Sequence, residues 1–283
     1  MSRAIWSMLG AILAFCIVDA LMKFLAGAYP IMQLVFLKSV FQLLPVLATV
    51  ARAGGWAPLK MRRPGFVLAR AGTILFATVF WFLGLRLLPL VDAFAIHFTA
   101  PILVVVLSRL ILKEPMPGKA VVALALGFAG ALAITIETAT GGGEHGSPLG
   151  ILFIALSVLF YASSLLCIRR MGPDDAGMPS LFYASIVAVV GSGVTLPWIW
   201  TPMALQDWGL ILITGILAAL GGLGLGAAFS RAPASVVAPL EYTGMVWAIL
   251  FGYLLFGEKP DPVVLAGAGL ILIGSWMVSR RSG

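Results

Sequence analysis

A short set of ionisable residues lies inside long apolar stretches of this chain, and we expect its chemistry there. If such a stretch crosses a membrane, each charged side chain costs roughly 2.5 to 3.5 kcal/mol, so these residues mark functional sites. A carboxylate can hold an ammonium group or carry a proton, and a histidine can relay one. The ionisable residues within the apolar stretches are Asp19, Lys23, Lys38, Asp92, His97 and Glu241.

His97 and Glu241 occupy matching places, because a shift of the sequence by 144 residues places one on the other. Each follows a proline, Pro89 or Pro233, by eight residues, which is about 12 Å along a helix. We expect both side chains to reach the middle of a bilayer from opposite faces and to bind a solute there. Alternatively, they pair with each other, with Tyr242 or with a backbone carbonyl.

Other polar residues have spacings that predict structural or binding roles. Asp19 and Lys23 are four residues apart and share a helix face, so we expect them to neutralise each other as a structural pair. Lys38 either meets a substrate carboxylate or extends to the lipid headgroups. Glu114 and Glu258 are expected to tie helix ends to the loops that follow.

Aromatic residues in the middle of the apolar stretches indicate a planar or cationic cargo. A ring stacks on a ring, and a cation sits over a ring face. For each residue, packing or lipid contact is the alternative. The candidates for substrate binding are Phe80, Trp81, Phe94, Tyr161, Tyr242 and Trp247.

The elements that carry these residues are predicted to be transmembrane helices. The chain is 61% hydrophobic and only 10% charged, against roughly 25% charged residues in soluble domains. Apolar runs of membrane length predict an all-α membrane protein with ten transmembrane helices. They lie near residues 4–26, 31–51, 66–86, 90–112, 118–138, 148–169, 178–200, 208–230, 234–256 and 262–279.

Charge predicts how the helices are oriented. The net charge of +7 comes from basic residues in loops, which are topology signals rather than a nucleic-acid surface. With a cytoplasmic N-terminus, 13 of the 18 lysines and arginines fall on the cytoplasmic side, so both termini are expected there. The Gly-rich segment 139–147 is predicted to be an external linker between a domain at 1–138 and a domain at 148–283. Five helices in each half require opposite orientations, so the two halves are predicted to be inverted repeats.

Repeated motifs give the chain a family resemblance. The same shift aligns Pro89 with Pro233 and Glu114 with Glu258, and the runs at 112–115 and 256–259 surround those glutamates. These features resemble the drug/metabolite transporter superfamily in its ten-helix form with two EamA-type domains. Within it, the chain looks most like YddG-type exporters of aromatic amino acids and metabolites. The resemblance implies alternating-access export of a small amphipathic solute, with amino acids as the expected class, from the cytoplasm across a bacterial inner membrane.

Other functional classes fit the sequence less well. The chain has no H-E-x-x-H, no G-x-S-x-G and no P-loop, so we expect neither an enzyme nor a cofactor or metal. A channel would need rings of like charge, and a phosphate-bearing cargo would need several mid-membrane cations. Proton-coupled efflux of lipophilic or quaternary-ammonium drugs is the alternative. We expect a small-molecule substrate and the lipid bilayer as partners, and the carrier to work as a monomer or homodimer.

Overall fold

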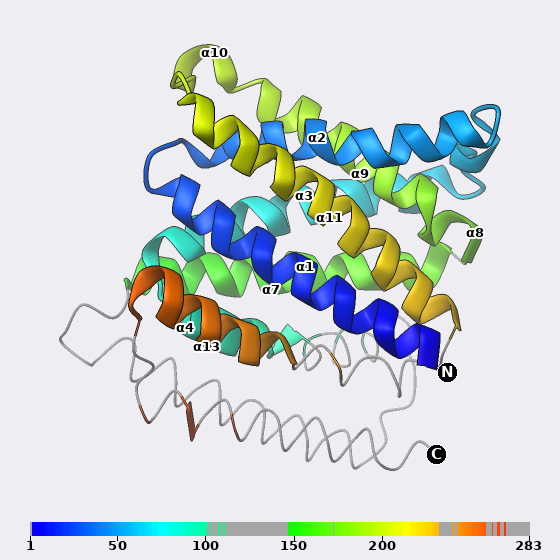
Figure 1. Ribbon diagram of the computed structural model, residues 1–283. Coiled ribbons are helices and arrows are strands. Elements are labelled where there is room, and N and C mark those ends of the chain that lie inside the picture. Colours follow the sequence, from blue (N-terminus) through cyan, green and yellow to red (C-terminus); the bar gives the residue numbers. More distant parts are fainter. Residues whose placement is uncertain are drawn as a thin grey trace.

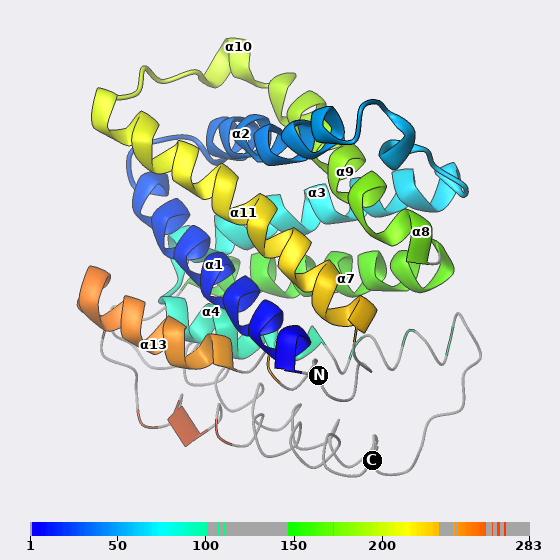
Figure 2. The ribbon, with the colours of Figure 1, turned by 45° about the vertical axis from the view of Figure 1, so that its right-hand side comes forward.

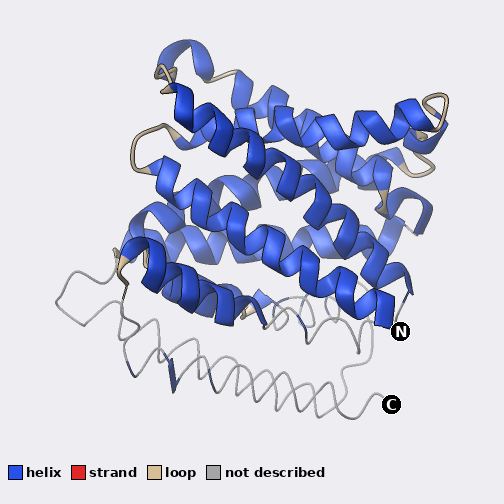
Figure 3. Cartoon of the chain, viewed as in Figure 1, coloured by secondary structure: helices blue, strands red, loops and turns tan. Residues whose placement is uncertain are grey.

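The regular structure of the chain is helical wherever the structure describes it, which confirms the predicted all-α class (Figures 1 and 3). An apolar chain in lipid has to satisfy its backbone N–H and C=O groups internally, and a helix does so within one segment. The computed structural model describes residues 2–100, 103, 107, 110, 147–171, 173–231, 240, 243–258, 262, 265, 266 and 269.

The first part of the chain follows the predicted spans closely. Its three long helices begin and end within two residues of the predicted bounds, and α4 covers the start of the predicted span 90–112. The span 118–138 lies outside the described residues. The elements are α1 (Ser2–Ala26), α2 (Ile31–Arg52), η1 (Ala57–Leu59), α3 (Pro64–Leu87) and α4 (Leu90–His97).

The second part of the chain corrects one predicted span. The single helix expected at 178–200 is wrong, because the chain turns between α9 and α10. The turn lies at residues 194–195, and Pro197, in the first turn of α10, has no N–H to donate to the carbonyl of Gly193, which favours a new helix start here. The span 262–279 lies almost wholly outside the described residues. The elements are α7 (Pro148–Met171), α8 (Pro173–Ala176), α9 (Met178–Gly193), α10 (Leu196–Ile199), α11 (Leu205–Arg231) and α13 (Thr243–Phe256).

Five of the described helices are long and apolar enough to cross a bilayer. These five helices are α1, α2, α3, α7 and α11. Helices α9 and α13 are also apolar but shorter.

Helices from before and after the segment 139–147 interleave (Figure 2). The most extensive packing joins α3 to α7 and α1 to α11, and α2 packs on both α9 and α11. Glycines permit the close approach. A Cβ at Gly84 would lie 2.3 Å from Ile154 Cδ1, and one at Gly215 would lie 2.4 Å from Phe41 Cβ.

The bundle has two ends, which we name after an acidic residue at each. At the Glu258 end, α1 and α3 finish and α2 and α4 begin. At the Asp175 end, α2 and α7 finish and α3 begins. The N-terminus lies at the Asp175 end, and α1 and α7 run in opposite directions (Figure 1).

Candidate functional site

Asp19 and Trp81 join α1 to α3 inside the bundle. The indole Nε1–H of Trp81 donates a hydrogen bond to Asp19 Oδ1 over 2.9 Å. Trp81 is buried and Asp19 is half-buried. A buried indole N–H requires an acceptor, and here the acceptor is a carboxylate in an otherwise apolar setting. This bond therefore fixes a carboxylate at the edge of the Trp81 ring.

Three more rings extend this cluster to α4 and α7. The Trp81 ring meets Phe94 edge-on with centroids 5.4 Å apart, and it meets His97 at 4.9 Å. His97 in turn lies 5.1 Å from the ring of Tyr161. Four of the residues predicted from the sequence, Trp81, Phe94, His97 and Tyr161, therefore come together in space. With Asp19 they form what we call the Asp19 cluster.

His97 brings an unused polar atom to the Asp19 cluster. Its Nδ1 is buried and has no hydrogen-bond partner in the structure. A buried polar atom without a partner carries a desolvation cost of about 1 to 3 kcal/mol. A bound solute or water that reached this atom would remove that cost.

Lys38 supplies a positive charge on the neighbouring helix α2. Its ammonium lies 3.5 Å from Gln42 Oε1, at the long limit of a hydrogen bond, and its charge acts on the carboxylate of Asp19. Lys38 is half-buried. An acid on α1, within the Asp19 cluster, and a cation on α2, beside it, thus lie inside the bundle.

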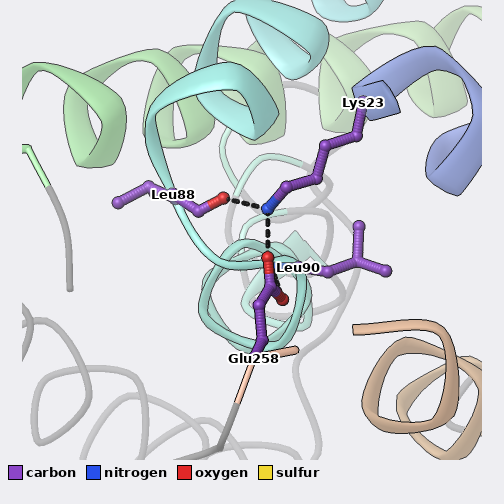
Figure 4. Close-up of polar contacts among 4 residues, drawn as sticks. All are labelled: Lys23, Leu88, Leu90 and Glu258. Atoms are coloured by element: carbon purple, nitrogen blue, oxygen red, sulfur yellow. Dashed lines mark hydrogen bonds and ion pairs between the residues drawn. The ribbon is translucent and has the colours of Figure 1, made fainter. Parts of the chain in front are cut away.

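Lys23 and Glu258 form a second polar centre at the Glu258 end (Figure 4). Lys23 Nζ lies 2.5 Å from Glu258 Oε1 and donates to the carbonyl of Leu88 over 2.6 Å. Glu258 Oε2 accepts the backbone N–H of Leu90 over 2.8 Å. Glu258 therefore satisfies a free amide at the start of α4 as well as a cation.

The predicted structural pair between Asp19 and Lys23 is wrong. Both residues do lie on α1 four positions apart, but each has a partner on another helix or turn. Lys23 reaches a carboxylate and a carbonyl at once, whereas Asp19 is needed by the indole of Trp81. Contacts with other helices and turns therefore replace the pairing that the four-residue spacing predicts.

Several other candidates lie apart from the Asp19 cluster. Phe80 stacks between Phe153 and Phe160 of α7, with centroids 5.9 and 5.8 Å away. Trp247 stacks on Phe251 of its own helix at 6.0 Å. Glu114, Glu241 and Tyr242 lie outside the described residues.

Arg70 is a half-buried cation that the sequence does not single out as a candidate. Its Nη1 donates to the hydroxyl of Ser180 on α9, and its Nε is buried without a partner. Its charge also acts on Tyr161. The available signal was its place seven residues into α3, well inside an apolar run.

The fold and these sites together define a multi-pass membrane protein with polar side chains placed inside a helix bundle. The sequence matches the EamA-like transporter family over residues 2–136 and again over 148–280. The chain belongs to this family and is a transporter.

Relatives with known roles differ in substrate and direction. The chain is 29% identical over 270 residues to the pseudopaline exporter CntI of Pseudomonas aeruginosa strain UCBPP-PA14, covering 94% of this chain and 92% of that protein. It is 27% identical over 254 residues to an S-adenosylmethionine uptake transporter of Rickettsia bellii strain RML369-C, covering 90% and 85%. These relatives are not specifically YddG-type exporters.

A solved crystal structure shares the fold. It superposes with a TM-score of 0.69 at 19% identity, covering 100% of this chain and 99% of the other. At that identity the likeness concerns the arrangement of the chain alone.

Proposed function

We propose that the protein is a secondary transporter that exports small amphipathic metabolites, amino acids including aromatic ones, from the cytoplasm by alternating access. The observation that carries this proposal is the Asp19 cluster. It places a carboxylate, a histidine and three further aromatic rings from four helices within one part of the bundle.

Each part of an amino acid has a matching group in or beside the cluster. Asp19 would receive the ammonium and Lys38 the carboxylate, since the two carry opposite charges on neighbouring helices. Trp81 and Phe94 would hold an aromatic side chain by edge and face contacts. His97 Nδ1 offers one more hydrogen bond. The expected occupant is therefore a zwitterion with a planar or apolar side chain.

Topology supports a carrier of inverted halves in a bacterial inner membrane. The antiparallel course of α1 and α7 agrees with two units of opposite orientation (Figure 1), and the two family matches divide the chain at the same linker. We propose that the chain crosses this membrane ten times and that both termini lie in the cytoplasm. We also propose, from the sequence, that Glu241 binds the solute together with His97.

The two relatives support the substrate class. S-adenosylmethionine is itself an amino acid with a cationic and an aromatic part, and the Rickettsia relative is named for its uptake. The Pseudomonas relative is named as an exporter. We adopt export because this relative, 29% identical over 270 residues, is named as an exporter.

A second function, proton-coupled efflux of lipophilic or quaternary-ammonium cations, is favoured by one observation. Asp19 is a carboxylate bonded to Trp81, whose ring packs on His97, and a carboxylate beside aromatic rings is a setting that attracts organic cations. A cation of this kind has no carboxylate to pair with the ammonium of Lys38.

Transport into proteoliposomes tests both functions. Labelled phenylalanine, leucine and a quaternary ammonium compound are supplied with and without a pH gradient. Asp19→Asn should lower amino-acid flux at least tenfold, because a charge-assisted hydrogen bond contributes about 1.5 to 3 kcal/mol. The matched control is Asp207→Asn, which alters a carboxylate at the Glu258 end that bonds Tyr29 instead.

Lys38→Met separates the two functions. If the cargo is an amino acid, this variant loses flux as Asp19→Asn does. If the cargo is a lipophilic cation, Lys38→Met transports at the wild-type rate and the amino acids fail to move in any variant. Glu241→Gln is expected to abolish or uncouple the same flux.

A further inference from the structure

We propose that Lys23, Leu88, Leu90 and Glu258 form a latch that closes the Glu258 end of the bundle and opens when α13 moves away from α1 and α4 to let solute pass. This inference rests on the proposed function as a carrier. We call these four residues the Glu258 latch.

The Glu258 latch joins three segments, so it is more than a pair of side chains (Figure 4). Lys23 comes from α1, Leu88 and Leu90 flank the turn from α3 to α4, and Glu258 follows α13. The ammonium bonds a carbonyl of the turn, and the carboxylate bonds an amide at the start of α4. Losing the charge on Glu258 therefore loosens all three segments together.

The carboxylate is held firmly to the end of α13. Gly257 adopts a left-handed φ of +65°, and the N–H of Glu258 bonds back to the carbonyl of Gly252 over 3.0 Å. A Cβ on Gly252 would lie only 2.8 Å from Glu258 Oε2, so the absence of a side chain makes room for the carboxylate. Glu258 consequently moves with α13.

Lys23 and Glu258 are shielded from solvent, so each charge depends on the other for stabilisation. The Lys23 and Glu258 side chains are 12% and 15% exposed, and the ring of Phe256 lies 5.1 Å from the ammonium. Once separated, each charge has to find water or another partner, because an unpaired charge in an apolar setting is unfavourable. The open form is therefore one in which water enters this end.

The Glu258 latch lies directly beyond the Asp19 cluster. Lys23 follows Asp19 by four residues on the same face of α1, so one helical turn separates them. Among the described helices, α13 packs only lightly on α1 and α4 when compared with the packing of α1 on α11. Movement of α13 would open a route from the Glu258 end to Trp81 and Asp19.

Cys16 is a natural reporter of that movement. Its Sγ lies 3.8 Å from the carbonyl of Gly244, so it sits between α1 and α13 and is buried. It precedes Lys23 by seven residues, two turns along the same face of α1. Separation of α13 from α1 would expose this thiol.

The experiment measures how fast a small charged thiosulfonate labels Cys16 in lipid nanodiscs, where both membrane faces are accessible. Cys167→Ser leaves Cys16 as the single cysteine. We expect Glu258→Gln and Lys23→Met each to speed labelling by about tenfold, since a minor open state is commonly populated at 0.1 to 10%. The unfolding midpoint of each variant is recorded alongside.

Asp207→Asn is the matched control. Asp207 Oδ2 accepts a hydrogen bond from Tyr29 over 2.6 Å, a bond that raises the pKa of Tyr29. This bond lies at the same end of the bundle, yet it joins the turn after α1 to α11 and leaves α13 aside. Labelling of Cys16 should proceed at its original rate in this variant.

Two outcomes would overturn the Glu258 latch. In the first, Cys16 is labelled no faster in the Glu258→Gln and Lys23→Met variants than in the Asp207→Asn control. The other is that neither latch variant folds while the control does, which would make the pair a structural support. The labelling needs no solute, so fast labelling without amino-acid flux would overturn the proposed substrate and support the latch. Amino-acid flux in the wild type, with Cys16 labelling unchanged in the latch variants, would support the proposed substrate and overturn the latch.

Discussion

Acidic side chains secure both ends of the helix bundle, but they bind different parts of it. At the Glu258 end, a carboxylate bonds an ammonium on α1 and an amide at the start of α4. At the Asp175 end, Asp175 is fully buried and accepts the backbone N–H groups of Arg62 and Arg63 over 2.8 and 2.7 Å. One carboxylate joins long helices, and the other joins a connecting segment to the short helix α8.

The difference indicates how each end responds when helices move. Contacts between connecting segments persist when helices tilt, because the segments can follow. A contact between the ends of α1, α4 and α13 has to break if those helices separate. We therefore expect opening of the Glu258 end to break the Glu258 latch, whereas the Asp175 contacts persist in both states of the carrier.

The largest expected effect on stability is at the Glu258 end. Glu258→Gln removes the carboxylate that is bonded to Lys23, and we expect the free energy of unfolding in mixed micelles to fall by about 3 kcal/mol. The double variant Lys23→Met/Glu258→Gln should lose less than the sum of the two single variants, because the pair is then removed as a unit. Strictly additive losses would show that the two charges do not interact.

Asp175→Asn is expected to lower stability by about 2 kcal/mol. The new amide group turns a donor toward one of the two backbone N–H groups, so one hydrogen bond is lost and two donors face each other. Because Asp175 lies at the opposite end from α13, Cys16 labelling should keep its original rate. If labelling rises as much as in Glu258→Gln, the two ends do not differ in the way proposed.

The sequence predicts the long helices well, because their length and composition are set by the bilayer. The bounds of α1, α2 and α3 follow from apolar runs alone. The sequence does not predict the break between α9 and α10, because a proline such as Pro197 is an ambiguous signal: Pro45 lies inside the continuous helix α2. How the halves interleave depends on glycines such as Gly84, whose contacts arise only once two helices meet.

The candidate site was predictable in its members but not in its pairings. Scarcity of polar residues in apolar runs singles out Asp19 and His97, although the spacing of Asp19 and Lys23 predicted a structural role for Asp19. Their partners depend on how the helices are rotated. Phe80 and Trp81 are adjacent in sequence, yet one packs on α7 and the other bonds Asp19, because successive residues of a helix point about 100° apart.

Gly252→Ala tests the fit of the Glu258 carboxylate with a smaller change. The added methyl group would lie against Glu258 Oε2 and push it from Lys23, so we expect a loss of about 1 kcal/mol. Cys16 labelling should rise, though less than in Glu258→Gln. Gly209→Ala is the matched control, since a Cβ there meets nothing within 4 Å. Equal behaviour of the two alanine variants would contradict the close fit.

Arg62→Ala should have the smallest effect, at most about 0.5 kcal/mol. The guanidinium lies 2.9 Å from Asp174 Oδ2, but the two side chains are 75% and 60% exposed. Water and salt weaken such a pair, and the backbone N–H of residue 62 keeps its bond to Asp175. Unfolding in low and high salt should therefore give nearly the same difference from wild type. A loss as large as that of Asp175→Asn would mean that the exposed ion pair, rather than the buried carboxylate, secures this end.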